Sequence, residues 1–213
     1  NMLFIMNPKA GRTTLKNSLV DVLEVFCNND YAVRTYLTKS ADDAERIVQE
    51  EGANYDVIVC AGGDGTLGNT VTGYMKSGIR VPLGYIPCGS TNDFARSMDI
   101  PRETIEAAEM IVKAEPFSID IGSLNDKNFV YVAAFGMFSD TSYAPPQNMK
   151  NIFGHAAYVL QGIKSLANVP SYKMKVTIDG DEQEGEFIFG MVSNSVSVGG
   201  FKSCLLYPSD AAD

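Results

Sequence analysis

The sequence predicts an α/β fold with a parallel sheet, followed by an incomplete antiparallel β-sandwich. Two observations indicate this fold. Up to about residue 114, short apolar runs of strand length alternate with longer segments of helical periodicity, and strands separated by helices pair in parallel through right-handed crossovers. Beyond about residue 116, strand-like segments follow one another across turn residues, which is typical of antiparallel sheet. The sequence therefore predicts an α/β domain over residues 1–118 and a partial β-sandwich over residues 119–202.

The first domain is predicted to alternate strands and helices. Its strands are expected at residues 2–6, 31–37, 57–61 and 81–86. The run at 57–61 is apolar throughout, as in a strand that is buried on both faces of a sheet. The helices are expected at residues 14–27, 41–51, 67–76 and 104–114, with Ser40 as the N-cap of the second one.

The second domain is predicted to contain two pairs of strands. Residues 117–124 and 129–138 are joined by Asn125-Asp126, and residues 172–178 and 186–193 are joined around Asp179-Gly180. The acidic run in the second turn is expected to be a solvated hairpin. A helix is expected at residues 151–167, in a segment without acidic residues. Its apolar stripe is a candidate lipid-facing surface, although packing over the sandwich is the commoner use of such a stripe.

Composition limits the classes of function. Of the 213 residues, 17 are basic and 26 acidic, which gives a net charge of -9. Binding to nucleic acid is driven by clustered lysine and arginine, so a nucleic-acid partner is not expected. No apolar run is long enough to cross a membrane and no secretory signal is visible, so we expect a cytoplasmic protein. The four cysteines form no CxxC pair and are expected to be buried, reduced thiols.

A glycine-rich loop over residues 62–66 is the strongest local signal. It has the sequence Gly-Gly-Asp-Gly-Thr and follows a buried strand at the carboxyl edge of the predicted sheet, where open α/β sheets bind ligands. Glycines let backbone N–H groups approach phosphate oxygens, and the following helix presents the positive end of its dipole. Asp64 would repel a phosphate directly, so its carboxylate suggests a bridging Mg²⁺.

Two further loops leave the same edge of the predicted sheet. Residues 7–11 read Asn-Pro-Lys-Ala-Gly, and residues 87–96 contain Gly-Ser-Thr-Asn-Asp-Phe-Ala-Arg. Each loop alone is a weak signal that a structural turn explains at least as well, but three polar, glycine-bearing loops at one edge are what a nucleotide cleft requires. The pattern matches neither a Walker A loop nor the GxGxxG turn of dinucleotide-binding folds.

These motifs, in this order and spacing, resemble the diacylglycerol kinase catalytic domain family, which includes bacterial lipid kinases and sphingosine and ceramide kinases. The Ile-Asp-Ile-Gly run at residues 119–122 matches a further element of that family, and the resemblance extends over residues 2–201. It implies an ATP-dependent, Mg²⁺-requiring transfer of the γ-phosphoryl group to a lipid hydroxyl, in a cleft between an α/β domain and a β-sandwich.

The resemblance also implies site residues. The glycine-rich loop would hold the ATP phosphates, and Thr38 and Ser90 would line the nucleotide site. Asp64, Asp93 and Asp120 would form a water-linked Mg²⁺ network, with Asp93 supporting catalysis. The full set of ATP-binding residues implied is Asn7, Thr38, Gly62, Gly63, Asp64, Gly65, Thr66, Asn69, Ser90 and Asn92. Without the resemblance, Asp93 and Asp120 would be interpreted as a helix cap and a domain-interface hydrogen bond.

The sequence departs from the family pattern in two places. Gly68-Asn69 stands where the family usually has Asn-Glu, so a carboxylate near the nucleotide is missing. After residue 202 the family pattern breaks off, and residues 203–213 resemble a translated sequencing adapter, which suggests an artefact. We therefore expect a C-terminally truncated chain that lacks the general base, whose position is unknown.

The leading hypothesis is an ATP-dependent lipid kinase that converts diacylglycerol to phosphatidic acid. The expected cofactors are ATP and Mg²⁺, and the expected partner is a lipid at a membrane surface, with peripheral membrane association and a homodimer as a candidate assembly. Three alternatives remain open: a sphingoid-base or ceramide kinase, an NAD kinase-like enzyme, and a nucleotide-binding module that is catalytically incomplete.

Overall fold

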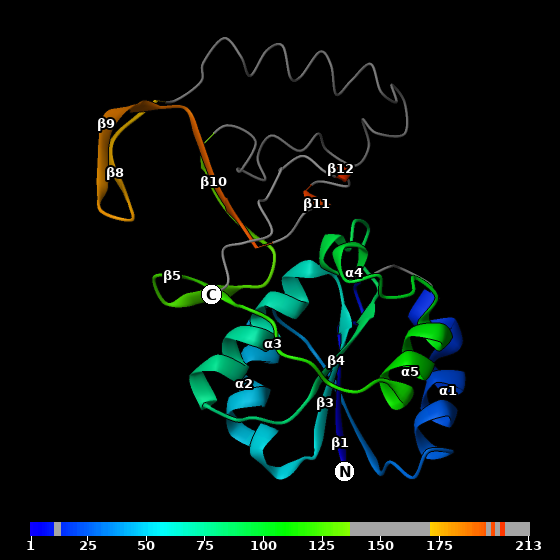
Figure 1. The fold of residues 1–213 in the computed structure, drawn as a ribbon. Helices are drawn as coiled ribbons and strands as arrows, with labels where there is room; N and C mark the ends of the chain where they lie inside the picture. The colour runs from blue at the N-terminus through cyan, green and yellow to red at the C-terminus, as the bar shows by residue number, and fades with distance from the viewer. Residues whose placement is uncertain (11–13, 137–170, 195–196, 199–200, 203–213) are drawn as a thin grey trace. The chain divides into compact units, whose positions relative to one another are not determined.

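A computed structural model describes residues 1–10, 14–136, 171–194, 197–198 and 201–202 (Figure 1). The chain divides into two compact units. The first unit comprises residues 1–132 together with the chain from residue 193 onward, and the second comprises residues 133–192. The domain boundary near residue 118 stays a prediction.

The first unit is built on a four-stranded parallel sheet of order β2-β1-β3-β4. Every residue of β1 and β3 is buried, as the continuous apolar runs predict, whereas β2 lies at the edge and is half-exposed. The strands are β1 (Met2–Met6), β2 (Val33–Leu37), β3 (Val57–Gly62) and β4 (Leu83–Pro87).

Helices cover both faces of this sheet (Figure 1). On one face, α1 (Thr14–Cys27) and α5 (Thr104–Lys113) pack over Phe4 and its neighbours. On the other face, α2 (Asp43–Glu51) and α3 (Asp64–Ser77) pack over Leu3 and Ile5, and the short 3-10 helix η1 (Gly52–Asn54) follows α2. Successive side chains of β1 therefore enter opposite cores, so a three-layer α/β/α arrangement results.

The structure corrects four details of the first unit. Ser40 is not the N-cap of α2: Asp42 occupies that position, and the carboxylate of Asp43 accepts the N–H groups of Lys39 and Ser40. Helix α3 begins at Asp64 rather than Leu67, because the glycine-rich motif itself forms its first turn. The short helix α4 (Asp93–Ser97) was not predicted. Cys27 is exposed, whereas Cys60 and Cys88 are buried as expected, and Cys204 lies outside the described residues.

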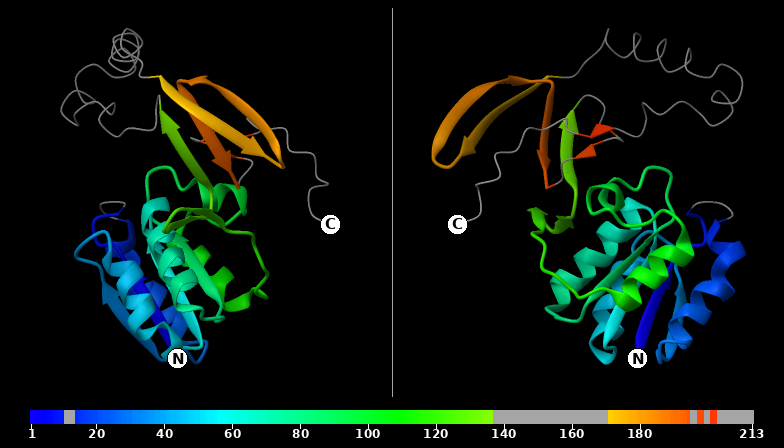
Figure 2. Two further views of the ribbon diagram at one scale, coloured as in Figure 1. Left: turned by 90° about the vertical axis from the view of Figure 1, so that its left-hand side faces the viewer. Right: turned by 45° about the vertical axis from the view of Figure 1, so that its right-hand side comes forward.

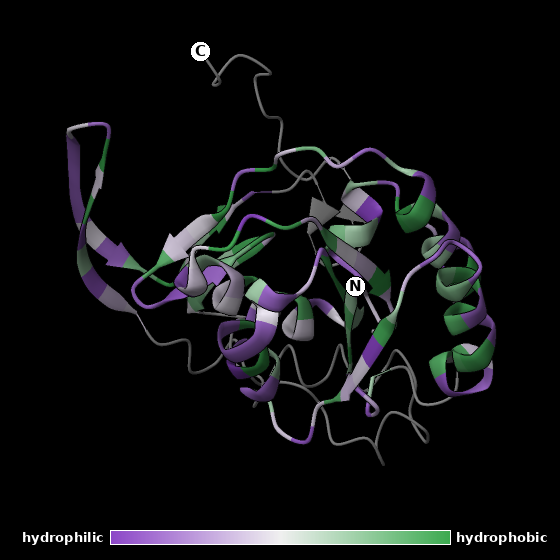
Figure 3. Ribbon diagram, turned by 90° about the horizontal axis from the view of Figure 1, so that it is seen from below, coloured by the Kyte–Doolittle hydropathy of each residue, from purple (hydrophilic) through white to green (hydrophobic). Residues whose placement is uncertain are grey.

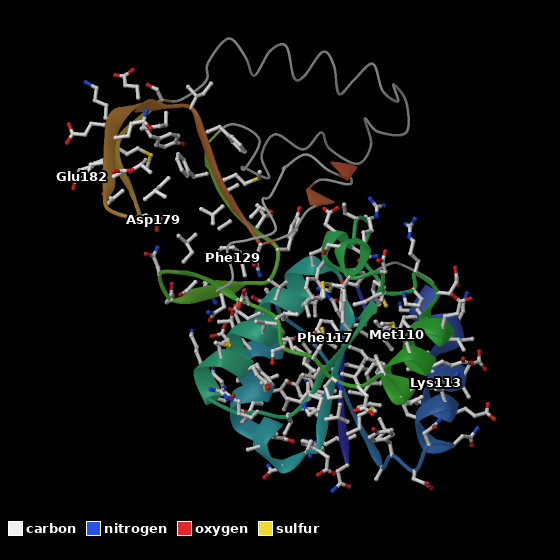
Figure 4. The ribbon with its side chains drawn as sticks, viewed as in Figure 1. Met110, Lys113, Phe117, Phe129, Asp179 and Glu182 are labelled. Carbon is white, nitrogen blue, oxygen red and sulfur yellow. The ribbon has the colours of Figure 1, made fainter. Side chains whose placement is uncertain are left out.

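A short hairpin follows α5 in the first unit. Only β5 (Gly122–Leu124) of the predicted strand 117–124 forms, and it pairs antiparallel with β6 (Lys127–Phe129) across the predicted turn. Residues 117–120, among them Phe117, are exposed (Figure 4). A Cβ on Gly122 would lie 2.2 Å from the ring of Phe129 opposite, which explains the glycine.

The second unit contains two pairs of strands in its described part (Figure 2). β7 (Val132–Gly136) pairs with β10 (Phe189–Ser193), and β8 (Tyr172–Ile178) pairs antiparallel with β9 (Asp181–Phe187). The predicted strand 129–138 is therefore divided between β6 and β7, and the predicted strand 186–193 is divided at Ile188. The helix expected at 151–167 lies outside the described residues.

The acidic hairpin is solvated, as predicted. Asp179, at its turn, and Glu182 carry exposed side chains (Figure 4), and the hairpin is largely hydrophilic in Figure 3. The last described strands are β11 (Ser197–Val198) and β12 (Phe201–Lys202), which pair antiparallel. A parallel α/β part followed by antiparallel strands is thus confirmed. In the described ranges, no helix has the length and hydropathy that a membrane span requires.

Candidate nucleotide-binding site

Three loops and the end of β2 meet at the carboxyl edge of the parallel sheet, and the sheet itself fixes where each begins. The N–H of Asn7 donates to the carbonyl of Ala61 at 2.9 Å, and the N–H of Thr38 donates to the carbonyl of Met6 at 2.9 Å. The N–H of Cys88 donates to the carbonyl of Gly62 at 2.7 Å. The backbone ladder therefore continues one residue beyond β1, β2 and β4, so the segments that follow these strands start from fixed positions.

The glycine-rich loop passes directly into helix α3. Gly63 is the N-cap, no side chain caps the helix, and the carbonyl of Gly63 accepts the N–H groups of Thr66 and Leu67. The earlier N–H groups of the first turn face the loop edge without a side-chain cap, which is the arrangement that binds anions at helix N-termini. A Cβ on Gly62 would lie 2.6 Å from that of Thr66, so this first turn requires glycine there.

The loops after β3 and β4 pack backbone against backbone. A Cβ on Gly89 would lie 2.6 Å from the Cα of Gly63. Asn92, in the left-handed region with a φ of 51°, holds the second loop: its side-chain amide donates to the carbonyl of Gly89 and accepts the N–H of Gly89. The hydroxyl of Tyr85, a residue of β4, donates to the carbonyl of Gly62 at 3.1 Å, which ties β4 to the end of β3.

The first loop is tied to α3 by a side-chain hydrogen bond. The side-chain N–H of Asn7 donates to the Thr66 hydroxyl at 2.9 Å, and the side-chain oxygen of Asn7 accepts the backbone N–H of Lys9 at 3.0 Å. On the other flank of α3, the Asn69 amide donates to the carbonyl of Ala41 at 2.8 Å. These contacts join the loops after β1, β2 and β3 around the N-terminal half of α3.

A cavity of about 430 Å³ opens between these loops. Among its described lining residues, Lys9 alone carries a charge, and the rest are small or polar. Seven of the ten predicted ATP-binding residues line it: Asn7, Thr38, Gly63, Gly65, Thr66, Asn69 and Ser90. The combination of one cation, an uncapped helix N-terminus and small side chains suits a phosphorylated ligand.

The other three predicted residues, Gly62, Asp64 and Asn92, do not line the cavity. Gly62 allows the tight first turn of α3, and Asn92, which is 4% exposed, shapes the second loop. Each carboxylate oxygen of Asp64 accepts one backbone N–H, from Asp93 and Phe94, at 3.3 Å. Asp64 therefore caps helix α4, and this contact accounts for a carboxylate in a phosphate loop without any metal.

The three aspartates of the predicted Mg²⁺ network are only partly brought together. Asp93 is 2% exposed and adjoins Asp64 through its own N–H. Asp120 is exposed, and its carbonyl accepts the side-chain amide of Asn194 at 2.6 Å. In the described residues, no three acidic, histidine or cysteine side chains gather closely enough to hold a metal ion. The network remains a prediction.

Several lining residues were not predicted. Lys9 and Gly89 lie in loops that the sequence singled out, but neither was assigned to the site. Ser40 was expected to cap α2 and instead lines the cavity, together with Ala41 and Ala44. The loop signal was sufficient to find Lys9 and Gly89, whereas the contribution of α2 depends on how it packs beside α3.

The titratable side chains buried in β3, in β4 and at the residue after β4 stay neutral at pH 7. Burial raises the pKa of the Cys88 thiol to about 11 and that of Cys60 to about 12. Burial, and then the negative charge of Asp64, raise the pKa of Tyr85. Neither thiol offers a thiolate nucleophile at neutral pH, so we assign these side chains to packing and hydrogen bonding.

A family model described as the diacylglycerol kinase catalytic domain matches residues 1–124. The chain belongs to the diacylglycerol kinase catalytic domain family. The chain is 36% identical over 200 residues to a diacylglycerol kinase of Bacillus subtilis (strain 168) and 34% identical over 202 residues to one of Staphylococcus aureus (strain JH9). Each match covers 93% of this chain.

The fold agrees with solved structures of the diacylglycerol kinase family. A crystal structure of a diacylglycerol kinase from Bacillus anthracis str. Sterne superposes with a TM-score of 0.75 at 29% identity, covering 95% of this chain and 67% of that one. A second structure from this strain gives a TM-score of 0.79 at 31% identity. The chain covers 66% and 63% of the two curated relatives, so it spans about two thirds of their length.

Proposed function

We propose that the protein is an ATP-dependent lipid kinase that transfers the γ-phosphoryl group of ATP to diacylglycerol, giving phosphatidic acid. The observation that carries this proposal is the cavity between the three loops, with Lys9 and the N-terminus of α3 facing it. Its volume of about 430 Å³ lies within the usual range for nucleotide-sized ligands. The relatives named diacylglycerol kinase support the choice of acceptor.

Different lining residues of the cavity suit different parts of ATP. Gly63, Gly65 and Gly89 present backbone without side chains, and Lys9 adds a positive charge, which favours the phosphates there. Ala41 and Ala44 offer an apolar surface at the N-terminal end of α2, which favours the base. Phosphoryl transfer depends mainly on positioning and charge neutralisation, which these groups supply.

In this proposal Mg²⁺ binds together with ATP, and the protein does not need a metal site formed by its own side chains alone. Magnesium usually keeps several waters and is held by one or two carboxylates together with substrate phosphates. Asp64 uses one lone pair on each oxygen to cap α4, so about two of its four acceptor sites stay available to a hydrated ion. When bound, the ion would neutralise charge on the phosphates.

The lipid side of the proposal rests on the family resemblance. The acceptor is expected at a membrane surface, which requires cytoplasmic, peripheral association, and the proposed β-sandwich would supply the lipid-binding part. The boundary near residue 118, the tail of residues 203–213, the general base and the homodimer stay predictions. A sphingoid base or ceramide remains the alternative acceptor.

The acceptor is tested by a panel assay. This chain, and a version extended by the downstream genomic sequence, are offered ATP and Mg²⁺ with diacylglycerol, sphingosine, ceramide or NAD. We expect phosphatidic acid as the main product. Phosphorylated NAD without lipid product would contradict the proposal, and a phosphorylated sphingoid base would redirect it.

The nucleotide site is tested separately by two glycines of α3. A Cβ at Gly65 or at Gly68 meets no atom within 4 Å, yet only Gly65 lines the cavity. Alanine at either helical position should stabilise the fold by about 0.5–1 kcal/mol.

We expect Gly65→Ala to weaken ATP binding roughly tenfold because the methyl group keeps phosphate oxygens from the backbone. Gly68→Ala is the matched control, with unchanged affinity by calorimetry. Equal affinities would show that phosphates do not approach Gly65.

A further inference from the structure

Tyr131 lies where the chain leaves the first compact unit and later returns to it. The first unit ends at Val132 and resumes at Ser193. The N–H of Asn194 donates to the carbonyl of Tyr131 at 2.8 Å, and the Asn194 amide donates to the carbonyl of Asp120 at 2.6 Å. The returning segment is therefore hydrogen-bonded to the backbone of Tyr131 itself.

The side chain of Tyr131 points toward the nucleotide loops. Its ring packs against the core cluster that contains Leu67 of α3 and Phe94 of α4. Its hydroxyl donates to a carboxylate oxygen of Asp93 at 3.0 Å. Asp93 is 2% exposed, and its N–H is held by Asp64. The packing of its ring restricts the movement of Tyr131, and its hydroxyl orients the Asp93 carboxylate.

We propose that Tyr131 is a positioning residue for phosphoryl transfer. Its hydroxyl holds the Asp93 carboxylate beside the glycine-rich loop, and its backbone links this carboxylate to the segment that re-enters the first unit at Ser193 and Asn194. The inference rests on the proposed function. Neither Tyr131 nor Asn194 lines the cavity. Tyr131 therefore acts through Asp93, and Asn194 through the backbone of Tyr131, and neither acts on ATP directly. Turnover should therefore depend on the hydroxyl, whereas ATP binding should not.

A double-mutant cycle tests this role in whichever form of the protein is active in the panel assay. Tyr131→Phe should lower kcat at least about fivefold, as expected for one hydrogen bond to a charged group, and leave the KM for ATP within about twofold. In the Asp93→Ala background, Tyr131→Phe should cause no further loss, because the carboxylate through which the hydroxyl is proposed to act is removed. Asp93→Val, which also removes the acceptor of the Tyr131 hydroxyl, repeats the cycle if the alanine variant fails to fold.

Tyr74→Phe is the matched control. Its hydroxyl also donates one hydrogen bond, to the carbonyl of Val81 at 2.8 Å, but on the part of α3 away from the loops. We expect unchanged kcat for this variant. Additive losses from Tyr131→Phe and Asp93→Ala, or an unchanged kcat in Tyr131→Phe, would overturn the positioning role.

A parallel measurement separates this inference from the proposed function. The same variants are assayed for ATP hydrolysis without a lipid, which needs the loops but no acceptor. In one outcome, Tyr131→Phe slows ATP hydrolysis in the wild-type background but not in the Asp93→Ala background, and the panel assay gives no lipid product. This outcome would overturn the proposed acceptor and support the role of Tyr131. Absence of both reactions in the wild-type protein would overturn both proposals.

Discussion

Strands β3 and β9 have similar lengths but differ in burial, since β3 lies in the core and β9 lies at the surface. All six residues of β3 are buried between two layers of helices, whereas six of the seven residues of β9 are exposed. β3 is stabilised by apolar packing on both faces. β9 is stabilised by its backbone ladder to β8 and by the ion pairs Lys173–Glu186 and Lys175–Glu182. The candidate site is therefore built on the part of the molecule with the larger described core.

The largest expected difference between these two regions is in core truncation. Phe4 is fully buried in β1 and makes an edge-on ring contact with Phe26 at 5.6 Å. Phe4→Ala should lower the free energy of unfolding by about 3–5 kcal/mol. Ile178→Ala, at a residue that is 66% exposed in β8, should change it by less than about 0.5 kcal/mol. Urea denaturation followed by circular dichroism measures both. A cost above about 2 kcal/mol for Ile178→Ala would show that this face of the hairpin is covered in solution.

A medium effect is expected from Glu45, whose side chain is only 12% exposed and which accepts hydrogen bonds from Lys127 and Lys76, each at 2.8 Å. These two lysines, Lys127 first, hold the pKa of Glu45 below its ordinary value of 4.5. Because the folded-state pKa is lowered, the stabilisation is complete well above pH 4.5 and is lost as the pH falls through the folded-state pKa.

The Glu45→Gln variant should therefore be less stable than the wild type by about 1–2 kcal/mol at pH 7. The difference should shrink as the pH falls below 4.5, when Glu45 itself becomes protonated. Thermal unfolding across pH 3–7 gives the curve. Glu109→Gln serves as the control, because its ion pair with Lys113 is exposed. A difference that does not depend on pH would exclude the ion pairs as its cause.

The smallest effect is expected in the acidic hairpin. Lys175 lies 2.7 Å from Glu182 across β8 and β9, with side chains 49% and 55% exposed. Lys175→Ala should cost no more than about 1 kcal/mol, and the cost should fall as salt is added, because exposed ion pairs are screened. Denaturation at low and high ionic strength checks this. A larger, salt-independent loss would indicate that the Lys175 stem packs against apolar neighbours.

The same contrast explains which elements could be predicted from sequence. Continuous apolar runs predicted β1 and β3, and a helical stripe predicted the bounds of α1. Sequence patterns predicted secondary structure less well where tertiary contacts determine whether a helix or strand forms. Residues 117–121 carry the alternation of a strand but stay outside any described strand, and α4 has five residues, too few for a periodic signal.

The candidate site was predictable in its loops and less so in the roles of single side chains. Glycines and polar residues after buried strands located the cavity, because parallel strands end at one edge. The role of Asp64 depends on where α4 begins, since its carboxylate caps that helix across 29 residues of sequence. Tyr131 reaches Asp93 across 38 residues, a contact that no local pattern indicates.

The backbone hydrogen bonds that extend the sheet into the loops limit how the sequence can vary in length. Asn7, Thr38 and Cys88 each occupy a register position set by the neighbouring strand. An inserted residue within β1 would shift Asn7 by one position and turn its side chain to the opposite face, away from Thr66. An insertion beyond Lys9 leaves all three register positions in place. Length variation in related chains should therefore be tolerated within the loops and excluded at the residues that begin them.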